Sequence, residues 1–416
     1  MTIGDTRPGE AGTIGAARSA AVRILPLHGR AQPYAWGSPT AIPGLLGTPP
    51  TGEPVAELWL GTHPQGPAEV ADGGLVRPAS DLVGELPFLL KVLAADKALS
   101  LQVHPDLEQA KAGFAADEAA GIPVGDPRRR YRDRNHKPEL IVALTPFRAL
   151  AGIRPAASAL AVARGLGHPG LQAAFAPLAS DPTGGAAQVL RSLLTLPREA
   201  GRELAAGVVA AAARVAPEGD SGEGVDPATA RAADLVRLLA AAHPGDVGIV
   251  AALLLNDVTL RPGEALFQPA RLLHAYVQGV GIEIMATSDN VLRGGLTPKH
   301  IDVNELLRIL DPRPTNAPVL TPRPLSSGPG GVLQTWDVPV RDFRLCEAVC
   351  TGGSLAVTGV SVLLAVEGSV ELGGTDATGA PLAPHHLERG QSALLTGPAT
   401  LTITGTGRVF LAGPGD

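Results

Sequence analysis

Short apolar runs broken by Gly and Pro cover the chain from Ala21 to about Pro155. The runs LPFLLKVL and SLQVH are examples, and each has the length of a single strand. Runs of this kind, bounded by turn-forming residues, are typical of β-structure. We therefore predict that this part of the chain is built from strands.

The pattern changes between Ala156 and about residue 245, where Ala and Leu recur at helical spacing, as in REAGRELAAGVVAAAARVA. Asp226 followed by Pro227 is a favourable N-cap and first-turn pair. The polar segment GDSGEG at 219–224 predicts a linker between two helices. We expect a helical insertion here.

The β-type pattern resumes after Leu253, and alternating runs bounded by Gly fill the C-terminal hundred or so residues. The fold class that we predict is mainly β with a helical insertion. The predicted divisions are a disordered extension (1–20), a catalytic β domain (21–155 and 246–312), a helical domain (156–245) and a C-terminal β domain (313–416).

Charge and hydropathy exclude several classes of partner. The formal net charge is −6, and the one dense basic cluster, RRRYR at 128–132, is expected to be a solvated loop, so we expect no nucleic-acid partner. An uninterrupted apolar stretch of about 18 residues and a secretory signal pattern are both absent from the sequence. We expect a cytoplasmic protein with no membrane partner, either a monomer or a weak homo-oligomer.

Polar residues of metal-binding type lie in three separate segments. Gln102 and His104 are two positions apart, which on a strand directs both side chains to one face. RNHKPEL supplies His136 and Glu139, and PARLLHAYVQG supplies His274. Two imidazoles, a carboxylate and an amide oxygen suit Zn²⁺ with an open position, and they also suit other divalent first-row metals.

Whole blocks of sequence carry a more specific signal. The chain resembles the type I mannose-6-phosphate isomerases, which are cupin-family metalloenzymes, in five segments and in the order of that family. The segments are QPYAWGS (32–38), AELWLGTHP (56–64), LPFLLKVLAADKALSLQVHP (86–105), NHKPELIVALTPF (135–147) and HAYVQGVGIEIMATSDNVLRGGLTPKHID (274–302).

The resemblance implies two cupin-type jelly rolls plus the α-helical domain, and one zinc ion per chain. It implies interconversion of mannose 6-phosphate and fructose 6-phosphate, a hexose phosphate substrate and a role in mannose metabolism. The zinc ligands of the family fall on Gln102, His104, Glu139 and His274, and its active-site arginine falls on Arg293. Generic cupins begin their metal motif with a histidine, so the glutamine favours an isomerase over an iron-dependent oxygenase.

Aldose–ketose isomerisation requires a proton shuttle and a cation for the enediolate. Arg293 is our candidate for the cation, because a guanidinium stays charged and donates in a fixed fork. His136, Glu283 and Asp289 are the candidates for the shuttle, and the sequence does not rank them.

The scarcity of lysine adds further candidates. The chain has five Lys against 29 Arg, so a retained Lys suggests that a compact or titratable ammonium is needed. Lys91, Lys137 and Lys299 lie in the family-like blocks and are candidates for phosphate contact or proton relay. The ring of Trp36 is a candidate for packing against a face of the sugar. Two alternatives remain: a non-catalytic cupin that binds sugar phosphates, and another metal-dependent cupin enzyme.

Overall fold

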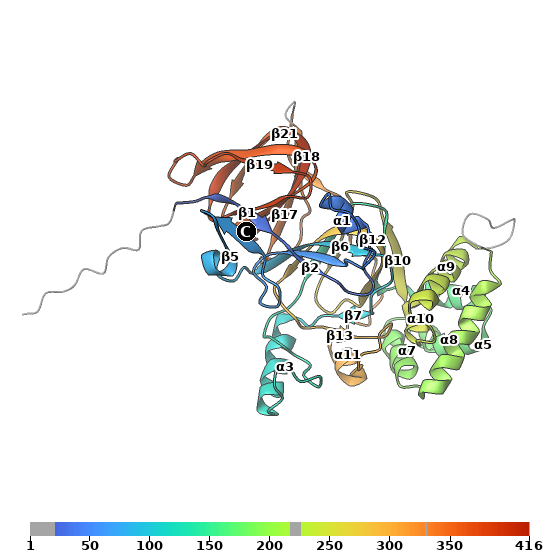
Figure 1. Ribbon diagram of the computed structural model, residues 1–416. Helices are drawn as coiled ribbons and strands as arrows, with labels where there is room; N and C mark the ends of the chain where they lie inside the picture. The colour runs from blue at the N-terminus through green and yellow to red at the C-terminus, as the bar shows by residue number, and fades with distance from the viewer. Residues whose placement is uncertain (1–20, 217–225, 329–330, 416) are drawn as a thin grey trace, which may run out of the picture.

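The computed structural model describes residues 21–216, 226–328 and 331–415. The predicted extension at 1–20 and the predicted linker at 219–224 lie outside these residues. The described chain is mostly β-sheet with helices, as the sequence predicts, and two large sheets dominate it (Figure 1). No helix in these ranges combines the length and the apolar character needed to span a membrane.

The first sheet contains most of the C-terminal strands together with three strands from near the N-terminus, and its ladders are antiparallel. In spatial order its described strands are β15 (Arg323–Gly328), β16 (Gly331–Thr335), β17 (Arg344–Val357), β21 (Ala399–Gly413), β18 (Ser361–Asp376), β20 (Ser392–Leu395), β1 (Ile24–His28), β4 (Glu69–Asp72) and β5 (Leu75–Pro78), with β19 (His385–Glu388) paired to β18. Because β1 pairs with β20, the first described strand and a strand near the C-terminus share one sheet.

The second sheet carries the segments that supply the predicted site. Its main path is β14 (Val319–Leu320), β11 (Ala265–Gln268), β8 (Glu139–Ala143), β12 (His274–Ala286), β6 (Phe88–Ala95), β3 (Glu57–Leu60) and β2 (Arg30–Gln32). Four strands branch from it: β9 (Phe147–Ile153) and β7 (Gln102–Val103) on β12, β10 (Leu255–Leu260) on β9, and β13 (Leu292–Arg293) on β7.

Most of the helices gather at one end of the molecule, beyond β10 (Figure 1). They are α4 (Ala156–Leu166), α5 (Pro169–Phe175), α6 (Pro177–Ser180), α7 (Gly185–Leu194), α8 (Arg198–Ala213), α9 (Pro227–Ala242) and α10 (Gly248–Ala252). The helices expected after residue 156 are therefore present, and Asp226 caps α9 as predicted by accepting from the amide of Thr229. The remaining helices are α1 (Ala41–Leu45), α2 (Ser80–Val83), α3 (Leu107–Ala119) and α11 (Val303–Ile309). The first three correct the prediction that the chain from Ala21 to about Pro155 is built from strands; α3 begins at Leu107 because Asp106 and Gln109 form a capping box.

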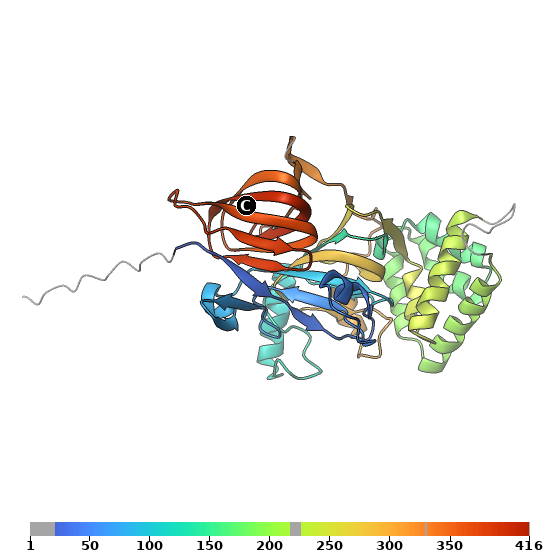
Figure 2. The ribbon, with the colours of Figure 1, turned by 45° about the horizontal axis from the view of Figure 1, so that its top comes forward.

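Strand β6 is buried on both faces. One face packs in an apolar core, and the other borders the polar site. Phe88, Leu90 and Val92 pack in one core cluster with residues of the first sheet such as Leu364 and Phe410, which places this core between the sheets (Figure 2). Since side chains alternate along a strand, the positions between them point the other way. Lys91 is among these, and the second face holds the polar site.

Strand β12 belongs to both parts of the second sheet. Its first half pairs with β9 and β7, and its second half pairs with β6 and β8. Gly279 lies at the change with a φ of 131°, and a Cβ there would come within 2.8 Å of the Cα of Phe147. Only glycine fits that conformation and that approach. The positive φ of Gly279 therefore marks the point at which β12 changes its strand partners.

The cluster RRRYR is only in part the solvated loop that the sequence suggested, since Arg128 and Arg132 are exposed. Arg129 and Tyr131 are buried, and Arg129 donates hydrogen bonds to the carbonyls of Tyr131 and Ile122. The Tyr131 hydroxyl bonds to Glu305 of α11. The prediction failed for Arg129 and Tyr131 because the Arg129 guanidinium bonds to carbonyls of its own loop, while the Tyr131 hydroxyl bonds to a residue that is distant in sequence.

Candidate metal centre and adjoining cavities

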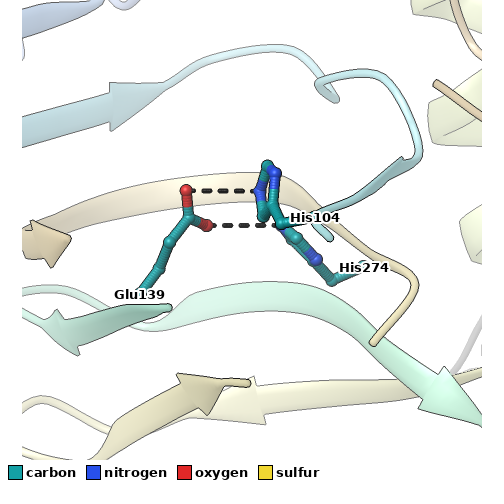
Figure 3. Close-up of side chains that lie close together, drawn as sticks. All are labelled: His104, Glu139 and His274. Atoms are coloured by element: carbon teal, nitrogen blue, oxygen red, sulfur yellow. Dashed lines mark ion pairs between the residues drawn. The ribbon is translucent and has the colours of Figure 1, made fainter. Parts of the chain in front are cut away.

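Three predicted metal ligands converge in the interior of the second sheet. The Nε2 atoms of His104 and His274 lie 3.4 Å and 3.3 Å from the two carboxylate oxygens of Glu139. All three side chains are buried, and their ligand atoms lie within 4.8 Å of one another. Figure 3 shows the two imidazoles facing the carboxylate.

Strand register explains why residues distant in sequence meet here. His274 of β12 lies directly opposite Gln102 of β7, and Gln102 lies directly opposite Arg293 of β13. Directly paired residues point to the same face of a sheet. A line of three predicted site residues therefore crosses three strands, and His104 follows β7 by one residue.

Two backbone carbonyls fix the tautomers of the imidazoles. The Nδ1 of His104 lies 2.8 Å from the carbonyl of Asn290, and the Nδ1 of His274 lies 3.0 Å from that of Leu272. A carbonyl can only accept, so each Nδ1 carries the proton and each Nε2 presents a lone pair. This is the usual support of a metal-bound histidine.

The donor set fits a divalent ion. The Nε2 of His104 is buried and has no hydrogen-bond partner among the described residues, although buried polar atoms are nearly always satisfied. Burial lowers the pKa of His104 to about 4, which keeps the imidazole neutral as a metal ligand must be. Burial opposes ionisation of Glu139, but the nearby charge of Lys137 helps to hold its pKa well below the usual range. Gln102 lines a cavity together with Glu139 and His274.

A buried network of charges continues from the metal-binding residues. Lys91 lies 3.1 Å from Glu283 and 3.7 Å from Glu57, and the Tyr276 hydroxyl lies 2.7 Å from Glu283. Burial works against the charge of Lys91, but Glu57 and Glu283 outweigh it and raise the pKa. Burial also raises the pKa of Glu283, even though Lys91 opposes this. Glu283 is therefore a carboxyl group whose proton affinity has been increased.

These residues line a cavity of about 50 Å³, together with Gln102, Lys137, Glu139 and His274. A second, open cavity of about 920 Å³ is lined by Asp289, Arg293 and Lys299, among others. Arg132 lies in its wall too. The charge of Arg293 lowers the pKa of Lys299, and burial together with Arg132 lowers that of Arg293. Such a cluster of like charges favours an anionic ligand.

Of the remaining predicted residues, one contacts a metal-binding residue directly and the others contact residues outside that group. Lys137 is 3.0 Å from Glu139. His136 is engaged elsewhere, since its Nε2 lies 3.0 Å from both carboxylate oxygens of Asp342. Asp289 lies 3.4 Å from the Nε2 of His63, whose hydrogen bond helps to lower the pKa of Asp289 against the effect of burial. Trp36 stacks on Tyr34 with ring centroids 5.8 Å apart.

Two contributors were not found from the sequence. Asn290 is fully buried, and its side chain accepts from the amide of Arg132 while donating to the carbonyls of Asp133 and Asn135. It joins two of the family-like segments and orients His104 through its own carbonyl. Arg132 belongs to the basic cluster RRRYR and is exposed as predicted, but it lines the open cavity next to Arg293. A fully buried asparagine leaves no periodic signal in a single sequence.

Comparison with known proteins agrees with this geometry. A family model described as the catalytic domain of type I phosphomannose isomerase matches residues 24–156. The mannose-6-phosphate isomerase of Salmonella typhimurium is 37% identical over 363 residues, covering 82% of this chain and 88% of that protein. The Homo sapiens mannose-6-phosphate isomerase is 31% identical over 409 residues, covering 89% and 93%.

A solved structure extends the likeness to the fold. The Salmonella typhimurium mannose 6-phosphate isomerase bound to fructose 6-phosphate and zinc superposes with a TM-score of 0.81 at 33% identity. The match covers 94% of this chain and all of the other.

Proposed function

The chain belongs to the type I phosphomannose isomerase family, and from this premise we propose that it interconverts mannose 6-phosphate and fructose 6-phosphate with one bound zinc ion. The observation that carries the proposal is the buried Nε2 of His104, which has no hydrogen-bond partner in the described part of the chain and lies within 4.8 Å of the ligand atoms of His274 and Glu139. Gln102 is the fourth proposed ligand. When bound, zinc would polarise the sugar oxygens at C1 and C2 and offset the charge that develops there.

Glu283 is the proposed proton shuttle among the three candidates. It lines the metal-side cavity, and its raised pKa suits a group that must both take and return a proton near neutrality. In the forward direction it takes the C2 proton of the open-chain aldose. The C–H electron pair becomes the C1–C2 double bond, and the carbonyl pair moves to O1, which gains a proton from water. The proton on Glu283 then returns to C1, where the double-bond pair forms the new C–H bond. O2 gives its proton to water, and the O–H pair forms the carbonyl at C2, so no net proton is consumed.

The other candidates take supporting roles in this proposal. Arg293 stabilises the oxygen charge of the enediolate, and Lys137 adds positive charge beside Glu139. Lys299 contacts the phosphate at the open cavity, and Asp289 lines the same cavity. Lys91 holds Glu283 in place.

His136 and Trp36 have no proposed part in the proton transfer. We propose that His136 fixes the segment before Lys137 through its bond to Asp342, and that Trp36 borders the sugar.

We also propose the finer architecture. The two sheets correspond to two cupin-type jelly rolls, with a catalytic domain (21–155 and 246–312), a helical domain (156–245) and a C-terminal domain (313–416). The protein is proposed to be cytoplasmic, to bind neither membranes nor nucleic acid, and to be a monomer or a weak homo-oligomer.

A coupled assay tests the function. The purified chain should isomerise mannose 6-phosphate without O₂, lose activity on chelation and regain it when zinc is restored. His274→Ala should lose both metal and turnover, because one of the imidazole ligands is gone. A chain that binds zinc and hexose phosphate but gives no fructose 6-phosphate would be a binding protein and would refute the proposal.

A further inference from the structure

Gln268 is a buried polar residue of β11 that neither the sequence blocks nor the ligand set involves. Its side chain is fully buried, and it lies directly opposite Glu139 in the ladder between β11 and β8. Its Oε1 lies 2.9 Å from the hydroxyl of Tyr276, which in turn lies 2.7 Å from Glu283. Its Nε2 has no hydrogen-bond partner among the described residues. The Gln268 amide is thus the last member of a hydrogen-bonded series that runs through Tyr276 to Glu283.

Proton counting shows why an amide at this end matters. The Tyr276 hydroxyl has one proton and cannot donate to both Gln268 and an ionised Glu283 at the same time. With Glu283 ionised, its carboxylate accepts the hydrogen bond of the Tyr276 hydroxyl. The Gln268 amide must then turn so that its NH₂ donates to the tyrosine oxygen. With Glu283 protonated, the acid donates to Tyr276, and Tyr276 donates to the Gln268 carbonyl. Gln268 can serve both arrangements because it carries a donor and an acceptor.

We propose that Gln268 is a positioning residue that keeps the Tyr276 hydroxyl on the Glu283 carboxyl group whether that group is charged or protonated. The inference rests on the proposed function, in which Glu283 alternates between the two states in each turnover. An apolar residue of similar size would fill the space without leaving a buried amide group unpaired. The buried amide is therefore explained by its effect on Tyr276 rather than by packing.

The test uses the zinc-loaded full chain with Gln268→Met and Gln268→Leu, two apolar replacements of similar size. Leu266→Met is the matched control, because Leu266 lies two residues earlier on the same face of β11 and is also fully buried. Each Gln268 variant should lower kcat about three- to tenfold, the range of one hydrogen bond. KM, zinc content and Tm should stay close to the values of the control.

A double-mutant cycle separates positioning from a general effect on the core. Tyr276→Phe removes the hydroxyl that Gln268 holds, so adding Gln268→Met to Tyr276→Phe should change kcat by less than about 1.5-fold. An equal loss in both backgrounds, or an unchanged kcat in both single Gln268 variants, would overturn the inference. If the wild-type chain itself lacks isomerase activity, the proposed function fails instead, and the two failures are thus distinguishable.

Discussion

The effect of Lys91→Met on stability can be worked out from distances in the structure. The ammonium of Lys91 is buried with two carboxylates, Glu283 at 3.1 Å and Glu57 at 3.7 Å. At an effective dielectric constant of about 20, these distances correspond to attractions of ~5 and ~4.5 kcal/mol. Burial of the ammonium offsets much of this sum. Removing one partner of a buried pair costs about 3–5 kcal/mol, because the other charge is left uncompensated. We expect a loss of that size in the free energy of unfolding.

The pH dependence of this loss gives the sharper test. Burial already raises the pKa of Glu283, and Lys91 opposes the rise, so Lys91→Met should raise it further. A folded-state pKa above the unfolded value means that the folded chain binds a proton which the unfolded chain lacks. The stabilisation from that proton is present at low pH and is lost as the pH rises through the folded-state pKa. The variant should therefore be more strongly destabilised at about pH 8 than at about pH 6.

Urea unfolding of the chelator-treated protein at both pH values measures the effect. Lys97→Met is the matched control, because Lys97 is exposed just beyond the end of β6 and its replacement should change stability by no more than about 0.5 kcal/mol. Equal, small effects for Lys91→Met and Lys97→Met would refute the reasoning, as would a loss at Lys91 that does not vary with pH.

Three further outcomes are expected. Arg293→Ala should lower kcat about 100- to 1000-fold while zinc content stays unchanged, measured by coupled assay and metal analysis, and loss of zinc would make Arg293 structural instead. In the chelated protein the pKa of His104 is about 6.5 in the unfolded chain and about 4 in the folded chain. The free energy of unfolding should therefore fall by ~2 kcal/mol from about pH 7 to about pH 5, because only the unfolded chain gains a proton at this residue. Urea titrations of His104→Gln should show most of that fall removed. Asp342→Asn should lower the free energy of unfolding by about 1 kcal/mol, since the His136 bond weakens, and no further loss should follow when His136→Asn is already present.

The candidate ligands could be predicted from the sequence, because each stands in a segment whose residue order is specific. The helical spacing after Ala156 predicted the helices that the structure contains. The prediction that Gln102 and His104 share the face of one strand applies only up to Val103, where β7 ends. The ranking of His136, Glu283 and Asp289 could not be predicted. All three are acid–base residues in family-like blocks, and only their surroundings distinguish them.

The sequence by itself indicated the long β-type stretches, the helices after Ala156 and the residue types available for a metal, since these depend on local periodicity and side-chain chemistry, but it missed helix α3 (Leu107–Ala119) inside the stretch predicted as strands. The tertiary structure alone decided which of those groups meet. The pairing of β7, β12 and β13 aligns Gln102, His274 and Arg293, and burial raises the pKa of Glu283 while it lowers that of His104. Register and burial are properties of contacts between distant segments, so no single stretch of the chain contains them.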